Sequence, residues 1–228
     1  MMITFTNTKG GVGKSTLATH LAVYLVDQGS TVALLDVDEQ RSSSQWALEA
    51  EPRITVRTAD TPEAVANEVK NLQASHDFVI ADAPGRVGDE TRTLMLLSDL
   101  AIFPMTPSIL DLRSVTTATE TLKYARTINN GRLEGLLVLN RIKVRDTISR
   151  ELKDAAGQLG LTVATTPVRD LQAFRDSAQQ GTVVTRMGYR GREAAQDVTQ
   201  LFTEILSTTE SLKDNRTAIQ KPGRVANE

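Results

Sequence analysis

The residues with the clearest chemical potential form one short run, Lys9-Gly10-Gly11-Val12-Gly13-Lys14-Ser15-Thr16. A β-rich apolar segment precedes this run and a segment with helical spacing follows it, which is the context that a phosphate-binding loop requires. Glycines leave backbone N–H groups able to curl around phosphate oxygens, and the start of the helix adds a partial positive charge. We expect Lys14 to reach the β- and γ-phosphates, Ser15 to bind Mg²⁺ and Thr16 to contact the α-phosphate. The residues predicted to hold the nucleotide phosphates are therefore Gly10, Gly11, Val12, Gly13, Lys14, Ser15 and Thr16.

Carboxylates follow two later apolar segments of the chain. Asp36 and Asp38 end one segment, and Asp82 ends another. The carboxyl ends of parallel strands meet at one edge of a sheet, so these side chains are expected beside the phosphate loop, where a metal ion and water lie. Asp82 is predicted to hold Mg²⁺ through water. Gly85 follows three residues later, and its backbone N–H is expected to contact the γ-phosphate and so to distinguish ATP from ADP.

The elements that must position these residues alternate along the chain. Short apolar runs, rich in β-branched residues, alternate with stretches of helical spacing, which predicts βαβ units. The right-handed crossover rule then gives an α/β fold with a doubly wound, mostly parallel β-sheet and helices on both faces. The expected strands are residues 2–6, 31–36, 54–57, 77–81, 100–105, 133–140 and 161–165, and the expected helices include 15–28, 90–97, 109–128, 147–159 and 191–206.

These motifs resemble those of the ParA/MinD superfamily of deviant Walker-box ATPases, which are P-loop NTPases. The run from Lys9 to Thr16 is similar to the deviant Walker A motif of that family, and residues 36–40 resemble its second motif, although Glu39 stands where a proline is usual. Residues 78–85 resemble its Walker B element. The chain is most similar to the small ParA subgroup, which includes ParF-like plasmid partition proteins and McdA-like carboxysome-positioning proteins.

The resemblance implies roles for individual residues. Lys9 reaches across a dimer interface to the phosphates of the partner, and Asp38 activates the attacking water, so Lys9, Lys14 and Asp38 are the predicted catalytic residues. ATP and Mg²⁺ are the implied cofactors, with Ser15, Asp38 and Asp82 at the metal. The residues implied at the nucleotide base are Asn140, which would read adenine, together with Pro167 and Arg169.

Charge is distributed unevenly along the chain. The net charge is −2, yet residues 141–192 hold 10 Lys and Arg against 5 Asp and Glu. A positive segment on a mildly acidic protein indicates contact with a polyanion, although charge alone fits a solvated helical face nearly as well. The candidates for contact with DNA phosphates, besides Arg169, are Arg141, Lys143, Arg145, Arg175, Arg186, Arg190 and Arg192.

The function that the resemblance implies is a slow ATPase that forms a homodimer with ATP and binds DNA without sequence specificity. An adaptor protein, ParB-like or of another kind, would stimulate hydrolysis, and the cycle would position or segregate a plasmid, a chromosome locus or a protein organelle. We expect a cytoplasmic, nucleoid-associated protein, because no secretory signal and no membrane-spanning run is recognised.

Two alternatives remain open at this point. A MinD-like ATPase of the membrane surface would need an amphipathic C-terminal helix, and residues 211–228 carry few bulky apolar side chains. A dethiobiotin-synthetase-like enzyme would use the same ATP site for ligation. Cysteine is absent, which excludes the thiolate-dependent reductase and anion-pump relatives. The expected organisation is an ATPase domain over residues 1–208 and a disordered polar tail over residues 209–228.

Overall fold

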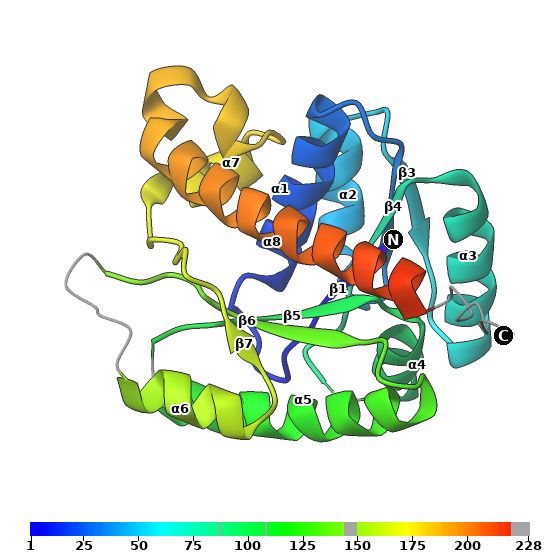
Figure 1. The fold of residues 1–228 in the computed structure, drawn as a ribbon. Helices are drawn as coiled ribbons and strands as arrows, with labels where there is room; N and C mark the ends of the chain where they lie inside the picture. Colours follow the sequence, from blue (N-terminus) through cyan, green and yellow to red (C-terminus); the bar gives the residue numbers. More distant parts are fainter. Residues whose placement is uncertain (87, 108, 144–149, 220–228) are drawn as a thin grey trace, which may run out of the picture.

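The centre of the molecule is a sheet of seven parallel strands in the order β3-β2-β4-β1-β5-β6-β7 (Figure 1). The structure is a computed structural model and describes residues 1–86, 88–107, 109–143 and 150–219. The strands are β1 Met2–Phe5, β2 Val32–Asp36, β3 Thr55–Thr58, β4 Phe78–Asp82, β5 Leu100–Met105, β6 Glu134–Leu139 and β7 Thr162–Val163.

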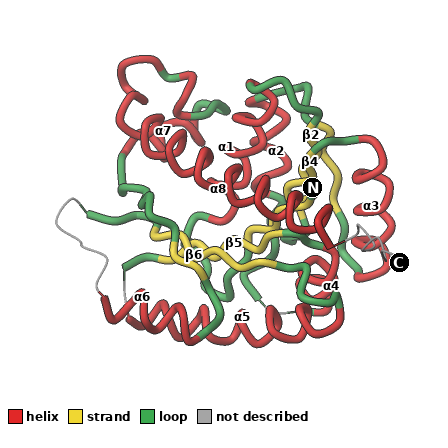
Figure 2. Tube along the Cα trace, in the orientation of Figure 1, coloured by secondary structure: helices red, strands yellow, loops and turns green. Residues whose placement is uncertain are grey.

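Helices cover both faces of this sheet (Figure 2). One face carries α1, α2, α7 and α8, and the other carries α3, α4, α5 and α6. The helices are α1 Lys14–Asp27, α2 Ser42–Ala50, α3 Pro62–Ser75, α4 Asp89–Leu97, α5 Ile109–Ile128, α6 Arg150–Gln158, α7 Gln172–Gln179 and α8 Arg192–Ile219, and two 3₁₀ turns are η1 Val184–Arg186 and η2 Gly188–Gly191.

The central strands are mostly apolar because the helices bury both of their faces. Every residue of β1, β2 and β5 is buried. Parallel pairing then brings the carboxyl ends of neighbouring strands to one edge: Asp82 of β4 pairs in register with Phe5 of β1 on one side and with Asp36 of β2 on the other. The predicted fold class is confirmed, and the phosphate loop and both carboxylates share one edge of the sheet.

The structure corrects the sequence prediction at the C-terminus. Helix α8 continues to Ile219, past residue 206, where the sequence predicted its end, while the division into a domain over residues 1–208 and a tail over residues 209–228 stays a prediction. The helix extends because its apolar stripe, from Val198 to Ile205, packs into the core and Thr209 is still buried further along. Residues 220–228 lie outside the described part of the chain. Among the residues that are described, the longest helices are too polar to cross a bilayer.

Candidate functional site

The phosphate loop joins β1 to α1 and is fixed by two close approaches. Gly13 takes the left-handed conformation (φ 97°) immediately before α1, and a side chain there would collide with the amide of Asn140. Asn7 accepts the Lys9 backbone N–H at its Oδ1 (3.0 Å) and donates from Nδ2 to the Pro104 carbonyl (2.7 Å). The loop is thereby tied to the ends of β5 and β6. Asn7 was not predicted as a site residue, because only its position in the fold reveals the contacts.

Lys14 lies buried at the start of α1, whereas Lys9 is exposed on the loop. Burial lowers the pKa of the Lys14 ammonium group, and the carboxylates of Asp82 and Asp38 act against this effect. Gly85 is also close, since a Cβ added to it would lie 3.7 Å from the Lys14 Nζ atom. The structure therefore brings Lys14, Asp38, Asp82 and Gly85 together, as the sequence predicted.

Asp82 is the most unusual group of this edge. It is fully buried, and neither carboxylate oxygen has a hydrogen-bond partner among the described residues. Burial raises the pKa of Asp82 to about 7; the side chains of Ser15 and Ser43 and the charge of Lys14 lower the pKa, while Asp36 raises it further. A buried carboxylate is stable only when it is paired or close to a cation, so this group marks the place of a positive ligand.

The residues at this edge fit Mg²⁺ that enters with a nucleotide. Ser15 supplies a hydroxyl beside the unpartnered carboxylate of Asp82, which matches a metal held by one or two protein oxygens, waters and phosphates. Within the described ranges, no group of three or more His, Asp or Glu side chains could hold a metal unaided. The protein therefore offers the partial shell that Mg²⁺ uses when phosphates complete its coordination.

Asp36 has a structural role that the sequence left open. Its Oδ1 accepts the Asp38 backbone N–H (3.0 Å) and its Oδ2 accepts the Ser44 backbone N–H (2.9 Å), so it fixes both the loop after β2 and the start of α2. Asp38 is partly exposed and accepts the Gln40 backbone N–H (2.9 Å). Helix capping is thus the observed role of Asp36, whereas Asp38 keeps its carboxylate near Lys14.

Glu39, the residue at the position where a proline is usual, pairs with Arg86 at 3.1 Å. Arg86 follows Gly85 and also lies 3.7 Å from Glu90. The ion pair therefore joins the loop after β2 to the turn after β4. Both side chains are more than half exposed, so the pair contributes little to stability.

A cavity of about 280 Å³ opens beside the phosphate loop, and its wall includes Gly11, Gly13, Asn140, Arg169 and Phe174. It is the expected place for a nucleotide base and sugar. Asn140 is buried and donates from Nδ2 to the Val12 carbonyl (2.7 Å), which leaves its carbonyl oxygen as an acceptor. Pro167 is partly buried and is not part of this wall. Phe174 was missed because α7, which carries it, was not predicted.

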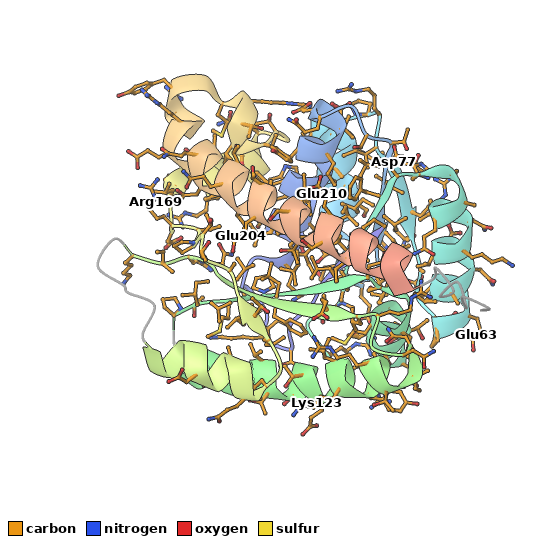
Figure 3. All side chains as sticks on the ribbon, viewed as in Figure 1. Glu63, Asp77, Lys123, Arg169, Glu204 and Glu210 are labelled. Atoms are coloured by element: carbon orange, nitrogen blue, oxygen red, sulfur yellow. The ribbon has the colours of Figure 1, made fainter. Side chains whose placement is uncertain are left out.

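Most of the candidate DNA-binding arginines are engaged by carboxylates. Arg141 and Arg175 both contact Asp170, at 3.5 and 3.1 Å. Arg169 lies beside the first turns of α8 (Figure 3), where it pairs with Asp197 (2.9 Å) and Glu193. All three arginines line the cavity beside the phosphate loop, and Arg169 also joins it to α8.

Arg186 is held more firmly. It donates to Asp27 and Glu51 (both 2.7 Å) and to the Ala50 carbonyl (2.6 Å), which identifies it as a structural residue. Arg190 and Arg192, by contrast, are exposed and form no ion pair within the described part of the chain. Lys143 is exposed, and Arg145 lies outside the described residues.

Comparisons with known proteins agree with this geometry. The profile of the CobQ/CobB/MinD/ParA nucleotide binding domain matches residues 3–211. The maintenance of carboxysome distribution protein A of Halothiobacillus neapolitanus is 34% identical over 205 residues, which cover 88% of this chain and 94% of that protein. Protein virC1 of Rhizobium radiobacter is 26% identical over 190 residues, covering 79% of this chain and 81% of the relative.

Solved structures show the same fold. The cell division ATPase MinD of Pyrococcus furiosus superposes with a TM-score of 0.73 at 22% identity, covering 91% of this chain and 99% of that one. An ATP complex of McdA from Cyanothece gives a TM-score of 0.70 at 16% identity, with coverage of 90% and 95%. MinD of Pyrococcus horikoshii, complexed with Mg-ADP, gives a TM-score of 0.68 at 20% identity, covering 90% of this chain and 95% of that one.

Proposed function

The chain belongs to the CobQ/CobB/MinD/ParA nucleotide-binding family, and from this premise we propose that it is an ATPase that dimerises around ATP and positions a large cargo. Members of the ParA/MinD group are P-loop ATPases, and the relative with 34% identity is named for maintaining carboxysome distribution. The proposed cofactors are ATP and Mg²⁺. The proposed cargo is a protein organelle, a plasmid or a chromosome locus, in the cytoplasm and over the nucleoid.

One observation carries the proposal. A buried cation, Lys14, and a buried carboxylate without a hydrogen-bond partner among the described residues, Asp82, lie together at the mouth of a glycine-rich loop. Neither group stabilises the fold in this arrangement, since both are desolvated. Phosphate oxygens would satisfy the ammonium group, and a hydrated divalent ion would satisfy the carboxylate.

The catalytic roles follow from the positions of the side chains. Lys14 would neutralise charge on the transferred phosphoryl group, and Asp38 would orient and deprotonate the attacking water. Lys9, which is exposed, would reach the nucleotide of a second protomer and add positive charge there only when the dimer closes. Mg²⁺, held at Ser15 and Asp82, would polarise the phosphoryl oxygens.

Contact with DNA is assigned first to Arg190 and Arg192. Both are exposed without an ion-pair partner in the described ranges, and Tyr189 beside them is 90% exposed. Arg141, Arg169 and Arg175 would have to leave their carboxylate partners to bind phosphate. Two copies of this face in a dimer would add their charges, and an adaptor protein that stimulates hydrolysis would release them.

The test is to measure molar mass by light scattering and DNA affinity by fluorescence anisotropy, with ATP, with ADP and without nucleotide. We expect a dimer and tight DNA binding only with ATP, and a steep loss of affinity as salt is raised, because phosphate contacts release counterions. Lys14→Ala should abolish ATP binding, while Asp38→Ala should bind ATP, stay dimeric and turn over slowly. A monomeric Asp38→Ala protein at saturating ATP would contradict the dimer, and full turnover by it would contradict the role of Asp38.

A further inference from the structure

Ser43 is a buried polar residue that the roles above leave without a function. It is the second residue of α2, its exposure is 0%, and its hydroxyl has no hydrogen-bond partner among the residues that the structure describes. The neighbouring serine differs, because Ser44 donates its hydroxyl to the Arg41 carbonyl (2.8 Å). Leaving a buried hydroxyl unpaired is unfavourable, so its partner is expected to come from outside this set of contacts.

The start of α2 lies next to the strand end that carries Asp82. Ser44 donates its backbone N–H to Asp36 (2.9 Å), and Asp36 is the register partner of Asp82 on the adjacent strand. Ser43 is therefore held over the carboxyl end of β4, where its side chain acts on the Asp82 carboxylate. The Ser43 side chain is thus close enough to Asp82 to lower the pKa of that carboxyl group, yet neither group reaches the geometry of a hydrogen bond in the described contacts.

We propose that Ser43 is a positioning residue for the metal site, and that its hydroxyl donates to Asp82 or to a metal-bound water when Mg²⁺ and nucleotide are present. The inference rests on the proposed ATPase function. A hydroxyl at this place fixes the orientation of a carboxylate that itself acts through water, as outer-shell partners of metal ligands do. Asp36 accepts the backbone N–H groups of both Asp38 and Ser44, so it links the start of α2 to the loop that carries Asp38. A hydrogen bond from Ser43 at the occupied metal site would therefore be coupled to the position of that loop.

Binding of Mg²⁺ to the ADP-saturated protein tests the role without relying on turnover. A fluorescent ADP analogue reports Mg²⁺ as it is titrated into metal-free wild type, Ser43→Ala and Ser43→Cys. We expect the dissociation constant for Mg²⁺ to rise roughly 10-fold in both variants, because each lacks a strong donor at this position. Affinity for the ADP analogue without Mg²⁺ should stay within about 2-fold of wild type, since phosphate contacts with the loop are intact.

Thr19→Val is the matched control. Thr19 on α1 is also fully buried, and its hydroxyl also lacks a hydrogen-bond partner within the described residues. Its replacement removes an equivalent group, so its Mg²⁺ affinity should equal that of wild type. The role of Ser43 would be overturned, and the ATPase proposal would stand, if Ser43→Ala bound Mg²⁺ as tightly as wild type. The same would hold if Thr19→Val lost as much Mg²⁺ affinity as Ser43→Ala. Absence of any Mg²⁺ effect in wild type would overturn the ATPase proposal as well.

Discussion

Two regions that both include a residue of α2 bury polar side chains, but only one of them pairs these groups. At the carboxylate edge, which we define by Ser43 and Asp82, the polar oxygens are buried without hydrogen bonds among the described residues. At the histidine corner, which we define by His20, Trp46 and Arg186, each polar group has a partner. Buried polar groups are normally paired, so the carboxylate edge is the exception.

The histidine corner ties the phosphate-loop helix to the segment before η1. His20 accepts the Val184 backbone N–H at Nε2 (3.1 Å), which leaves its Nδ1–H to donate to the Thr16 carbonyl (2.8 Å). Trp46 donates its ring N–H to the Thr182 carbonyl (2.8 Å). Its ring packs edge-on against that of His20, with 5.3 Å between the ring centroids. These contacts fix a neutral imidazole in one tautomer, as expected of a structural histidine.

The contrast separates residues that await a ligand from residues that complete the fold. Groups at the histidine corner gain nothing from an added ligand, because their hydrogen-bonding capacity is used. Groups at the carboxylate edge destabilise the protein until a cation or a donor arrives. A functional site is therefore marked here by unsatisfied burial, and the difference can be measured as a difference in stability.

The largest expected effect is that of Asp82→Asn. The pKa of Asp82 is about 7 in the folded protein, against 3.8 for an ordinary aspartate, so the folded state binds more protons between these values. Stability then decreases as pH rises from about 4 to about 7, by up to ~4 kcal/mol. Asp82→Asn cannot ionise, and at pH 8 its free energy of unfolding in urea should exceed that of wild type by about 2–4 kcal/mol.

Two comparisons sharpen this result. The gain from Asp82→Asn should shrink towards zero below about pH 3, where the carboxyl group is protonated in both the folded and the unfolded state. Asp36→Asn should instead lower stability at pH 8, because Asp36 already accepts backbone N–H groups of Asp38 and Ser44. An Asp82→Asn protein less stable than wild type at pH 8 would show that the carboxylate edge is not strained.

Much of this edge could be predicted from sequence, because its residues lie in local motifs. The loop at 9–16 and the strand ending at Asp82 were recognisable, and the bounds of α5 were predicted correctly. Helix α2 was not predicted, since it begins with three serines and is stabilised by distant contacts. Its Trp46, for example, is bonded to the carbonyl of Thr182, 136 residues away. Ser43 could not be singled out without that helix.

The histidine corner was the less predictable region for the same reason. Sequence treated Arg186 as one of several candidates for DNA contact, whereas the structure pairs it with Asp27, 159 residues away. A local pattern of positive charge reveals where arginines are, but it does not reveal which carboxylates the fold brings to them. The separation of Arg190 and Arg192 from the paired arginines therefore needed the fold.

The second prediction concerns His20. Burial lowers its pKa to about 4, against 6.5 for an ordinary histidine. The unfolded state then binds the extra proton, so stability decreases as pH falls from about 6.5 to about 4, by roughly 3 kcal/mol. The effect of His20 on stability as pH changes is opposite in sign to that of Asp82, so the stability of wild type should depend only weakly on pH over this range. In Asp82→Asn the His20 slope should appear alone, and NMR titration should find His20 neutral down to about pH 4. A midpoint near 6.5 would mean that the histidine corner is open to water.

The smallest effect distinguishes arginines that hold the fold from arginines that bind a partner. Arg186→Ala should lower the free energy of unfolding by about 1–2 kcal/mol, because it leaves the buried carboxylate of Glu51 with Arg53 alone and removes contacts that are partly exposed. Arg190→Ala should change stability by less than about 0.5 kcal/mol, since its side chain is exposed.

DNA affinity in the presence of ATP should show the opposite pattern. Arg190→Ala should weaken DNA binding and reduce the slope of log affinity against log salt concentration by about 1 per protomer, while Arg186→Ala, once folded, should bind DNA as wild type does. If Arg186→Ala weakened DNA binding more than Arg190→Ala while keeping its stability, the histidine corner would be part of the binding face, and the division between satisfied and functional groups would fail at that residue.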